Sequence, residues 1–347
     1  MENKVKWGVI GSGGIARRRT IPEGIIPAKN AELISVYDTN TEVNNLLAKE
    51  FNAFAASSTE ELLNSGIDAV YIATPVRMHL EQGIRCAMAG KHILCEKPLG
   101  LTVSEAEQLG EVCKKEGVLL GTAFMMGFSS QHQAALDLVR QGKIGKPVYC
   151  RAQLSCWYPP IAGAWRQDPK TSGGGSLIDM GSHCLDLLEM YFGRIKKVSC
   201  FIRNNVHTYS SEDSSIVSLV FENGAMGTVD SYFCIPDNSS KNVLELYGSR
   251  GSILASGTIG QETSGTMVAY PEDEDTGYNP LQARGTRDGI IVNPDPLNTY
   301  LAEIEEFSSS ILDGREPANS FARGLHSQKV IKACYQSAQS GTVVELF

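Results

Sequence analysis

The sequence lacks several features that mark whole classes of protein. No run of apolar residues approaches the ~18 that a membrane-spanning helix needs. The nine cysteines are odd in number and scattered, and no two are spaced as Cys-x-x-Cys, which argues against a disulfide framework or a structural zinc site. The first residues contain no apolar core of a secretory signal. We therefore expect a cytoplasmic protein with reduced thiols.

An excess of basic residues is also missing. Lys and Arg number 31 against 39 Asp and Glu, for a formal net charge of −8. Neither the first 122 residues nor the remainder has the basic excess of a nucleic-acid binder, and the short run Arg17-Arg18-Arg19 is typical of a solvated helix face. What the chain does have is 42% hydrophobic residues in 347, enough for two domains with sizeable cores.

The first 122 residues alternate between strand-like and helix-like segments. Apolar runs at 5–10, 33–37, 68–74, 92–95 and 118–124 predict strands, and the segments between them predict helices. This β-α-β rhythm indicates an α/β domain with a doubly wound parallel sheet, of the Rossmann type.

The rhythm changes after residue 124. Two helices are predicted at 133–141 and 176–191, and strands then dominate, with a hairpin turn at Asn223-Gly224. Residues 271–296 form a long irregular segment with an acidic tip at 272–275. We expect a second, α+β domain with an open, largely antiparallel sheet, and a division into domains 1–122 and 123–347.

A dinucleotide-binding pattern follows the first predicted strand. Gly11, Gly13 and Ala16 fit G-x-G-x-x-A, in which glycines permit a tight turn and close approach to a pyrophosphate at the start of a helix. Asp38 lies after the second strand, where a carboxylate binds the adenosine ribose and repels a 2′-phosphate. The pattern favours NAD, with NADP still possible because Arg17-Arg18-Arg19 lie nearby in the sequence.

Two further groups of residues suggest chemistry. Lys97 follows the strand at 92–95, and a lysine at the carboxyl end of a parallel strand can stabilise a developing alkoxide. Asp179 and His183 are four residues apart on one helix face, with Asp186 on nearly the same side, an arrangement suited to general acid–base catalysis.

Plainer interpretations of these groups remain open. Lys97 taken alone fits a surface lysine, and Asp179 with His183 fits a pair that satisfies itself at a helix end. A metal site from Asp179, His183 and Asp186 fits only loosely, because no second histidine is near, and we expect none. Hydrolysis by a Ser/His/Asp triad fits less well, since no G-x-S-x-G elbow is present.

Taken in order, the motifs resemble those of the Gfo/Idh/MocA family, named for glucose–fructose oxidoreductase, inositol dehydrogenase and rhizopine catabolism. They are the glycine fingerprint, Ala-Thr-Pro at 73–75, Glu-Lys-Pro at 96–98, Trp-Arg-Gln-Asp at 165–168, the glycines at 173–175 and Asp-x-x-x-His-x-x-Asp at 179–186. The resemblance covers nearly the whole chain. It implies a Rossmann domain followed by a domain whose open sheet packs subunits into homodimers or homotetramers.

The resemblance also implies roles for individual residues. Lys97, Asp179 and His183 are the expected catalytic residues, with His183 as the acid–base and Asp179 as its orienting or substrate-binding partner. His132 and Tyr158 are expected only as guesses on the substrate side. The expected cofactor-binding residues are Gly11, Ser12, Gly13, Gly14, Ile15, Asp38, Thr74, Pro75, His79, Glu96, Lys97, Trp165 and Arg166.

The function that these motifs favour is hydride transfer between NAD(P) and a hydroxyl-bearing carbon of a sugar, inositol or sugar derivative. Two alternatives stay open at this point, a redox-neutral glycoside-cleaving enzyme that recycles NAD and a dinucleotide-sensing regulator without turnover. Because regulators of this kind often lose the lysine or the histidine, the presence of both Lys97 and His183 argues against the last.

Overall fold

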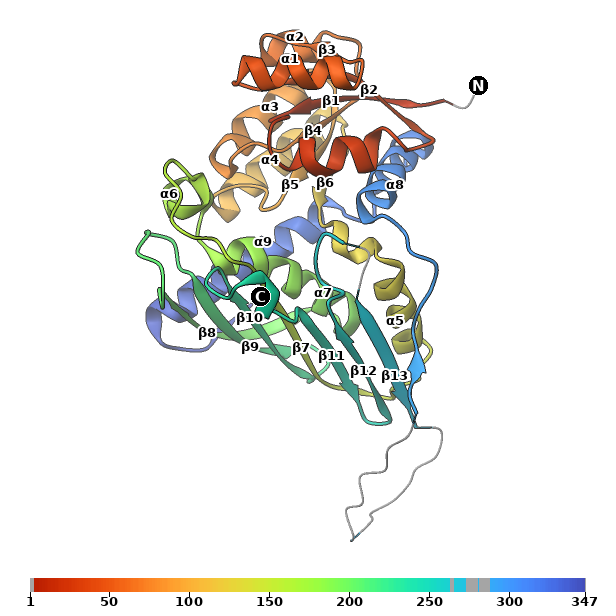
Figure 1. Ribbon diagram of the computed structural model, residues 1–347, viewed down its shortest axis with the longest axis vertical. Helices are drawn as coiled ribbons and strands as arrows, with labels where there is room; N and C mark the ends of the chain where they lie inside the picture. Colours follow the sequence, from red (N-terminus) through yellow and green to blue (C-terminus); the bar gives the residue numbers. More distant parts are fainter. Residues whose placement is uncertain (1–2, 263–264, 273–279, 281–287, 347) are drawn as a thin grey trace. The chain divides into compact units, whose positions relative to one another are not determined.

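The computed structural model describes residues 3–262, 265–272, 280 and 288–346. All of the acidic tip at 272–275 except Glu272 lies outside these residues. The chain divides into two compact units. The first comprises Met1–Met125, Ala162–Gly174 and Asn298–Lys332, and the second Met126–Ile161, Gly175–Leu297 and Ala333–Phe347. Each unit has its own sheet (Figure 1).

The first unit is built on a six-stranded sheet in the order β3-β2-β1-β4-β5-β6, with every strand pair parallel. The predicted Rossmann topology is therefore confirmed. The strands are β1 (Val5–Ile10), β2 (Ala31–Tyr37), β3 (Phe54–Ala55), β4 (Ala69–Ile72), β5 (His92–Glu96) and β6 (Leu120–Ala123).

Side chains that alternate along β1 point into two separate cores, one on each face of the sheet. Trp7 and Val9 belong to one cluster and Ile10 to the other. Helices cover both faces. The helices of this unit are η1 (Ala16–Ile25), α1 (Thr41–Glu50), α2 (Thr59–Leu63), η2 (Val76–Met78), α3 (His79–Met88), α4 (Val103–Glu116), η4 (Trp165–Gln167), α6 (Pro169–Ser172) and α8 (Thr299–Asp313).

One of these helices comes from the far end of the sequence. On α8, Phe307 packs its ring 5.7 Å from that of Trp7, and Ser308 accepts a 3.1 Å hydrogen bond from the Trp7 indole N–H. Helix α9 (Phe321–Ser340) begins in the first unit and ends in the second. The first unit thus includes α8 and the start of α9, which follow Met125 by more than a hundred residues in the sequence.

The second unit holds a nine-stranded sheet in the order β14-β13-β12-β11-β7-β10-β9-β8-β15. Within this second sheet, only β7 and β10 pair in parallel among the described strands, which confirms the predicted, largely antiparallel open sheet. The strands are β7 (Pro147–Ser155), β8 (Ile195–Arg203), β9 (Ser214–Phe221), β10 (Met226–Tyr232), β11 (Val243–Gly248), β12 (Gly251–Ser256), β13 (Thr266–Pro271), β14 (Ile290–Ile291) and β15 (Val344–Glu345).

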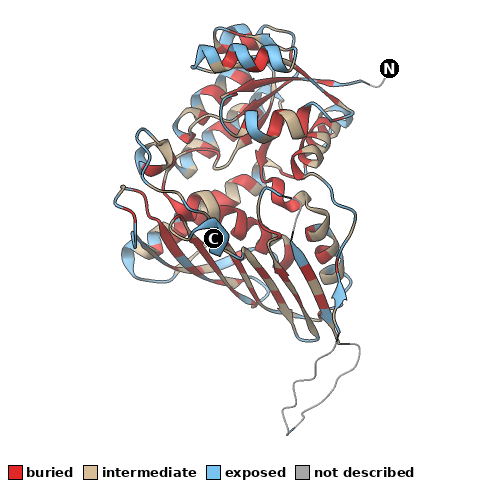
Figure 2. Cartoon of the chain, in the orientation of Figure 1, coloured by how far each residue is buried: buried red, intermediate tan, exposed pale blue. Residues whose placement is uncertain are grey.

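Helices cover one face of this second sheet, where its buried residues lie (Figure 2). Helix α7 (Ser182–Phe192) packs on β7, and a short π-helical segment, η5 (Leu177–Gly181), runs directly into α7. The other short helices of the unit are η3 (Met125–Phe128, beginning at the unit boundary), α5 (Ser130–Arg140) and η6 (Asp237–Ser239). Within the residues described, no helix is long and apolar enough to cross a lipid bilayer.

Candidate functional site

The glycine-rich loop after β1 is shaped by contacts that only glycine allows. Gly11 has a φ of +83°, and a Cβ there would lie 2.8 Å from the carbonyl oxygen of Ala73. A Cβ on Gly14 would meet nothing within 4 Å, so the loop is open at that point. The loop has the form that a pyrophosphate requires, with a close turn and an uncovered backbone ahead of a helix.

Asp38 holds this loop from the end of β2. One carboxylate oxygen accepts the N–H of Gly13 at 2.9 Å, and the other accepts the N–H of Asn40 at 2.9 Å. Asn40 in turn caps α1 by accepting a hydrogen bond from the N–H of Val43. The carboxylate is therefore fixed beside the loop, where the sequence predicted a ribose-binding group.

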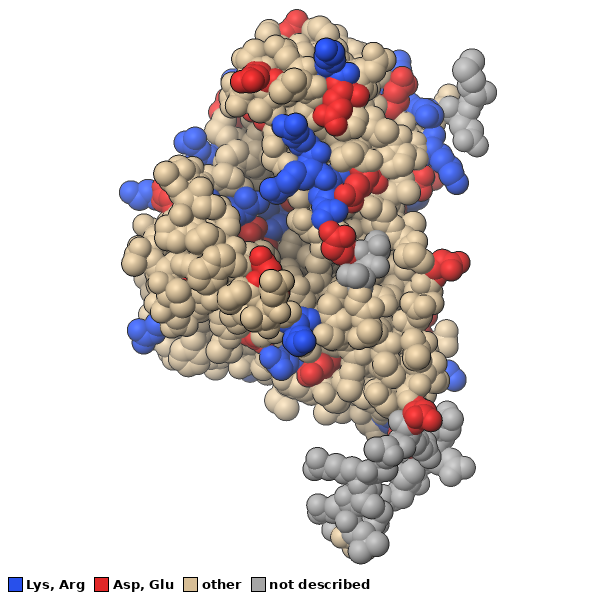
Figure 3. Space-filling view, in the orientation of Figure 1, with Lys and Arg blue, Asp and Glu red and all other residues tan. Residues whose placement is uncertain are grey.

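Two neighbours in the loop bear on whether a dinucleotide fits. The hydroxyl of Ser12 is buried and, among the residues described, has no hydrogen-bond partner. Ile15 precedes η1 without capping it through a side chain, which leaves the first N–H groups of the helix for an anion. These features fit a bound dinucleotide. Arg17 and Arg18 are exposed on η1. Figure 3 shows several Lys and Arg side chains gathered on the visible face.

The Ala-Thr-Pro and Glu-Lys-Pro segments lie next to each other because one side chain bridges them. His79, at the start of α3, is only 1% exposed, with Nδ1 2.8 Å from the carbonyl oxygen of Pro98 and Nε2 2.9 Å from that of Thr74. The Thr74 hydroxyl donates to Gln82 at 2.6 Å. Pro75, half-buried, precedes η2. The ring of His79 thus binds the two loops rather than facing outward.

Glu96 lies at the carboxyl end of β5, within a buried chain of hydrogen bonds. The Thr20 hydroxyl donates to the Tyr71 hydroxyl at 3.0 Å, and Tyr71 donates to Glu96 at 2.5 Å. Burial raises the pKa of Glu96, against the opposing effect of Lys97, Tyr71 and Arg166. Burial, followed by the charge of Glu96, raises the pKa of Tyr71 well above its usual value. The sequence did not single out Tyr71 or Thr20, since neither lies in a recognisable motif.

Lys97 follows Glu96 directly, and its positive charge acts to lower the pKa of the Glu96 carboxyl. The backbone N–H of Lys97 donates to Glu96 at 3.3 Å. In the same unit, Trp165 and Arg166 form η4, and the Arg166 guanidinium lies 4.3 Å from the centre of the Trp165 ring. A cation stacked on an indole is an ordered, partly desolvated group. The first unit thus contains every predicted cofactor-binding residue.

Asp179 and His183 belong to the second unit and share one helical run. Asp179 lies in η5, and His183, 9% exposed, lies one turn later in α7. The helix begins where the N–H of Asp179 donates to the carbonyl of Gly175 at 3.1 Å. Asp186 is buried further along α7. Among the described residues, no group of three or more His, Cys, Asp or Glu has the arrangement of a metal site.

The sequence missed Glu212, which contacts the start of this helix. Its carboxylate accepts the N–H of Gly175 at 2.9 Å and that of Leu177 at 3.1 Å, and the Tyr335 hydroxyl at 2.9 Å. Burial raises the pKa of Glu212. No local pattern marks this residue, because its partners lie 35 or more positions away.

His132, which we guessed to lie on the substrate side, is a buried residue of the second unit. His132 is fully buried, with Nδ1 2.8 Å from the carbonyl of Met126 and Nε2 3.3 Å from the Thr258 hydroxyl. Burial lowers its pKa to about 4. His132 is therefore a neutral buried residue with both ring nitrogens hydrogen-bonded, and a substrate contact from it stays a prediction. Tyr158 is half-buried, with its ring 5.2 Å from that of Phe233.

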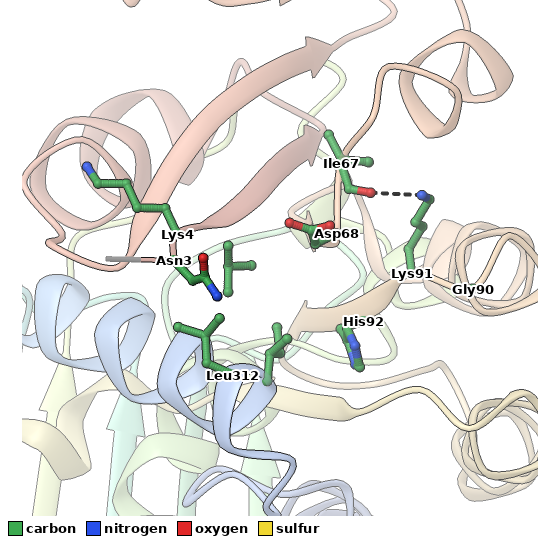
Figure 4. Close-up of a pocket in the computed structure, with 10 residues that line it drawn as sticks. Asn3, Lys4, Ile67, Asp68, Gly90, Lys91, His92 and Leu312 are labelled. Atoms are coloured by element: carbon green, nitrogen blue, oxygen red, sulfur yellow. Dashed lines mark hydrogen bonds between the residues drawn. The ribbon is translucent and has the colours of Figure 1, made fainter. Parts of the chain in front are cut away.

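A pocket of about 410 Å³ in the first unit lies at the wrong end of the sheet for catalysis (Figure 4). Its lining includes Asp68, Lys91 and His92, at or just before the starts of β4 and β5, and Lys91 donates to the carbonyl of Ile67 at 2.8 Å. Ligands of open parallel sheets bind outside the carboxyl ends of the strands. The pocket contains none of the predicted site residues.

Comparison with known proteins decides the family. Residues 5–124 match a sequence family described as "Oxidoreductase family, NAD-binding Rossmann fold", and residues 137–346 match its companion, "Oxidoreductase family, C-terminal alpha/beta domain". The chain belongs to the Gfo/Idh/MocA oxidoreductase family. The predicted family, the NAD-binding Rossmann domain and the NAD(P)-dependent oxidoreductase class are thereby confirmed.

Individual Gfo/Idh/MocA relatives match the chain end to end. The 1,5-anhydro-D-fructose reductase of Ensifer adhaerens is 28% identical over 98% of each chain. The myo-inositol 2-dehydrogenase of Thermotoga maritima is 28% identical over 99% of this chain and 98% of its own. A solved structure of levoglucosan dehydrogenase with NADH and levoglucosan superposes with a TM-score of 0.85, at 22% identity over 99% of both chains, which supports the fold.

Proposed function

We propose that this oxidoreductase transfers a hydride between NAD and a hydroxyl-bearing carbon of a sugar, inositol or sugar derivative. The observation that carries the proposal is the pairing of a glycine loop, held by Asp38, with a lysine that follows a buried carboxyl at the end of β5. Full-length relatives named for an anhydrosugar and for myo-inositol support the substrate class. The fixed Asp38 carboxylate favours NAD, with NADP as the second cofactor.

A bound nicotinamide supplies the carbon that accepts or gives the hydride. Lys97 stabilises the negative charge that grows on the substrate oxygen, through its Nζ ammonium. His183 takes the hydroxyl proton during oxidation and returns it during reduction. Since Nδ1 of His183 is buried, Nε2 is the atom assigned to that proton. Asp179, four residues earlier on the same helix face, orients His183 or binds substrate.

The remaining predicted residues bind and position the dinucleotide. The backbone at Gly11, Ser12, Gly13, Gly14 and Ile15 faces the pyrophosphate. Thr74, Pro75 and Glu96 line the cofactor, and Trp165 and Arg166 approach its nicotinamide end. His79 acts through the two loops that it holds. The proposal keeps residues 1–122 as the NAD(P)-binding domain and 123–347 as the substrate-binding and oligomerisation domain. Substrate choice is assigned to loops at 158–165 and 232–238.

Nicotinamide absorbance tests the function. Purified protein is incubated with NAD or NADP and a panel of inositols, aldoses and sugar acids. We expect NADH formation with at least one polyol or sugar, and loss of at least about 10²-fold in kcat for Lys97→Met or His183→Asn. Lys91→Met is the control, because Lys91 lies at the opposite end of the same sheet. Full turnover by either site variant would refute the assigned roles.

Silence across the panel would redirect the test to glycosides. Sugar release without net NADH would then indicate redox-neutral cleavage. NADH binding with no turnover of any kind would indicate a sensor. Both outcomes would overturn the proposed net oxidation or reduction.

The open face of the second sheet is the proposed surface for self-association. Phe201 and Ile216 pair across β8 and β9, and Phe201 is 73% exposed. An exposed apolar pair on a sheet face marks an interaction surface. We expect a homodimer or homotetramer by light scattering, and a monomer after Phe201→Glu. We also propose a cytoplasmic location, on the ground of the odd number and scattered spacing of the nine cysteines in the sequence.

A further inference from the structure

Three consecutive backbone N–H groups begin the helix that carries Asp179 and His183, and all three donate to one residue. The N–H groups of Gly175 and Leu177 donate to the Glu212 carboxylate, and that of Ser176 donates to the Glu212 main-chain carbonyl at 2.9 Å. The free N–H groups at a helix start favour a negative charge. Glu212 thus acts as a cap that comes from a distant part of the chain.

The fit at this cap is close. A Cβ on Gly175 would lie 2.0 Å from the carbonyl oxygen of Glu212, so any other residue would push the helix start away. The carbonyl of Gly175 accepts the N–H of Asp179, and Asp179 precedes His183 by one turn. A displacement of Gly175 therefore moves Asp179 directly and His183 with it.

The cap is buried and fixed from both sides. Glu212 is 7% exposed and directly precedes Asp213 and β9. The Tyr335 hydroxyl, on α9, donates to the same carboxylate oxygen that accepts the Leu177 N–H. A buried carboxylate is costly unless it accepts hydrogen bonds, and here it accepts three. The free-energy cost of burying the Glu212 carboxylate here is explained if the start of the helix must be held in place.

We propose that Glu212 is a positioning residue, which sets the place of His183 and Asp179 relative to the reacting hydroxyl by fixing the start of their helix. The expected effect on turnover rests on the proposed function. The expected effect on the position of His183 rests only on the contacts of Glu212. Misplacement of an acid–base group by about 1 Å costs about 10²-fold in rate.

The test compares two variants with a matched control. Glu212→Ala removes the cap and Glu212→Gln keeps its shape, although the amide presents one acceptor oxygen in place of two. Asp213→Asn is the control. The Asp213 carboxylate is also buried, and it accepts the N–H groups of Asn205, Val206 and His207, none of which lies in the helix. Each protein is measured well below its own unfolding temperature.

We expect Glu212→Ala to lower kcat by about 10²-fold and Glu212→Gln by less, with the NADH dissociation constant unchanged. Asp213→Asn should lower the unfolding temperature while kcat stays within about threefold of the wild type. Equal loss of kcat in Asp213→Asn, or full kcat in Glu212→Ala, would overturn the proposal.

A second measurement does not depend on turnover. Nitrogen-15 NMR of histidine-labelled protein follows six imidazoles, and His183→Asn assigns the signal of His183. Glu212→Gln should shift that signal and Asp213→Asn should not. If the wild type turns over no sugar but the signal shifts, the proposed function fails and the positioning role stands. An unmoved signal in Glu212→Ala refutes the positioning role whatever the activity.

Discussion

Two buried histidines, one in each unit, differ in the partners of their rings. His79 lies between two main-chain carbonyls, those of Thr74 and Pro98. His132 lies between a carbonyl and the hydroxyl of Thr258, which can donate. A neutral imidazole has one N–H and one acceptor nitrogen, so His132 is satisfied as a neutral ring while His79 can serve only one carbonyl at a time. The same residue type therefore fills a core in one unit and joins the Ala-Thr-Pro and Glu-Lys-Pro loops in the other.

The largest effect should come from removing the histidine that joins the loops. His79→Ala removes a fully buried ring and leaves the carbonyl that accepts its N–H without this partner, at a cost of about 1–3 kcal/mol for that hydrogen bond in addition to the lost packing. We expect lower stability in urea unfolding together with weaker NADH binding, because the 74–75 and 96–98 segments separate. His92→Ala, at the other end of the sheet, is the control and should lower stability alone. NADH affinity that is equal in both variants would break the comparison.

The effect of His132 should be visible in the free energy of unfolding at acidic pH. The pKa of His132 is about 4 in the folded protein and near 6.5 in the unfolded chain. As the pH falls from 6.5 to 4, the unfolded chain therefore binds a proton at His132 that the folded protein does not bind. The contribution of His132 is fully present above pH 6.5 and is lost progressively toward pH 4, by up to about 3 kcal/mol. In His132→Gln this part of the acid slope in urea-unfolding free energy should disappear. An unchanged slope would show that His132 is already protonated in the core.

Gly11 and Gly14, in the loop after β1, differ in the space that an added side chain would have. Gly11→Ala forces a side chain onto a positive φ against Ala73, at a cost of about 1–3 kcal/mol, and should abolish tight NADH binding. Gly14→Ala meets open space and should change stability by less than about 0.5 kcal/mol. Thermal unfolding of both variants, each with and without NADH, measures the difference. Equal destabilisation would contradict the described loop.

The smallest effect concerns cofactor preference. Asp38→Asn retains an acceptor for the N–H of Gly13 but removes the charge that repels a 2′-phosphate, while Arg17 and Arg18 remain exposed on η1. The ratio of kcat/KM for NAD to that for NADP should fall about tenfold, equivalent to about 1.4 kcal/mol. Steady-state kinetics with both cofactors measure it. A ratio that does not move would remove Asp38 from the ribose site.

The sequence predicted the first unit well because its signals are local. The strand at 5–10 matches β1, and the glycines that allow the loop lie within a few residues of each other. The central strand of the second sheet, β7, was missed, since Arg151 and Gln153 interrupt its apolar residues and point to the face that holds Asp230. Strand β8 was missed for a similar reason, with two lysines near its start.

Parts of the candidate site that depend on distant contacts were also beyond the sequence. Asp179 and His183 are visible as an i, i+4 pair, but Glu212 becomes meaningful only once β9 lies beside Gly175. The position of His79 in a helix is predictable, whereas its two carbonyl partners are not, because they depend on how β4 and β5 pair. Local periodicity cannot encode which strands become neighbours.

The way in which the chain passes between its units has a consequence during synthesis. Trp7 finds its partners on α8, Gly121 bridges to Ser320, and β15, near the end of the sequence, completes the sheet beside β8. The first 125 residues emerge from a ribosome long before α8 exists, and the second sheet lacks β15 until more than a hundred residues after β8 have been added. Neither unit can therefore complete its fold until segments much later in the sequence have been translated. A chain cut before α8 should expose the apolar surface around Trp7 and require a chaperone, although its nucleotide fingerprint is intact.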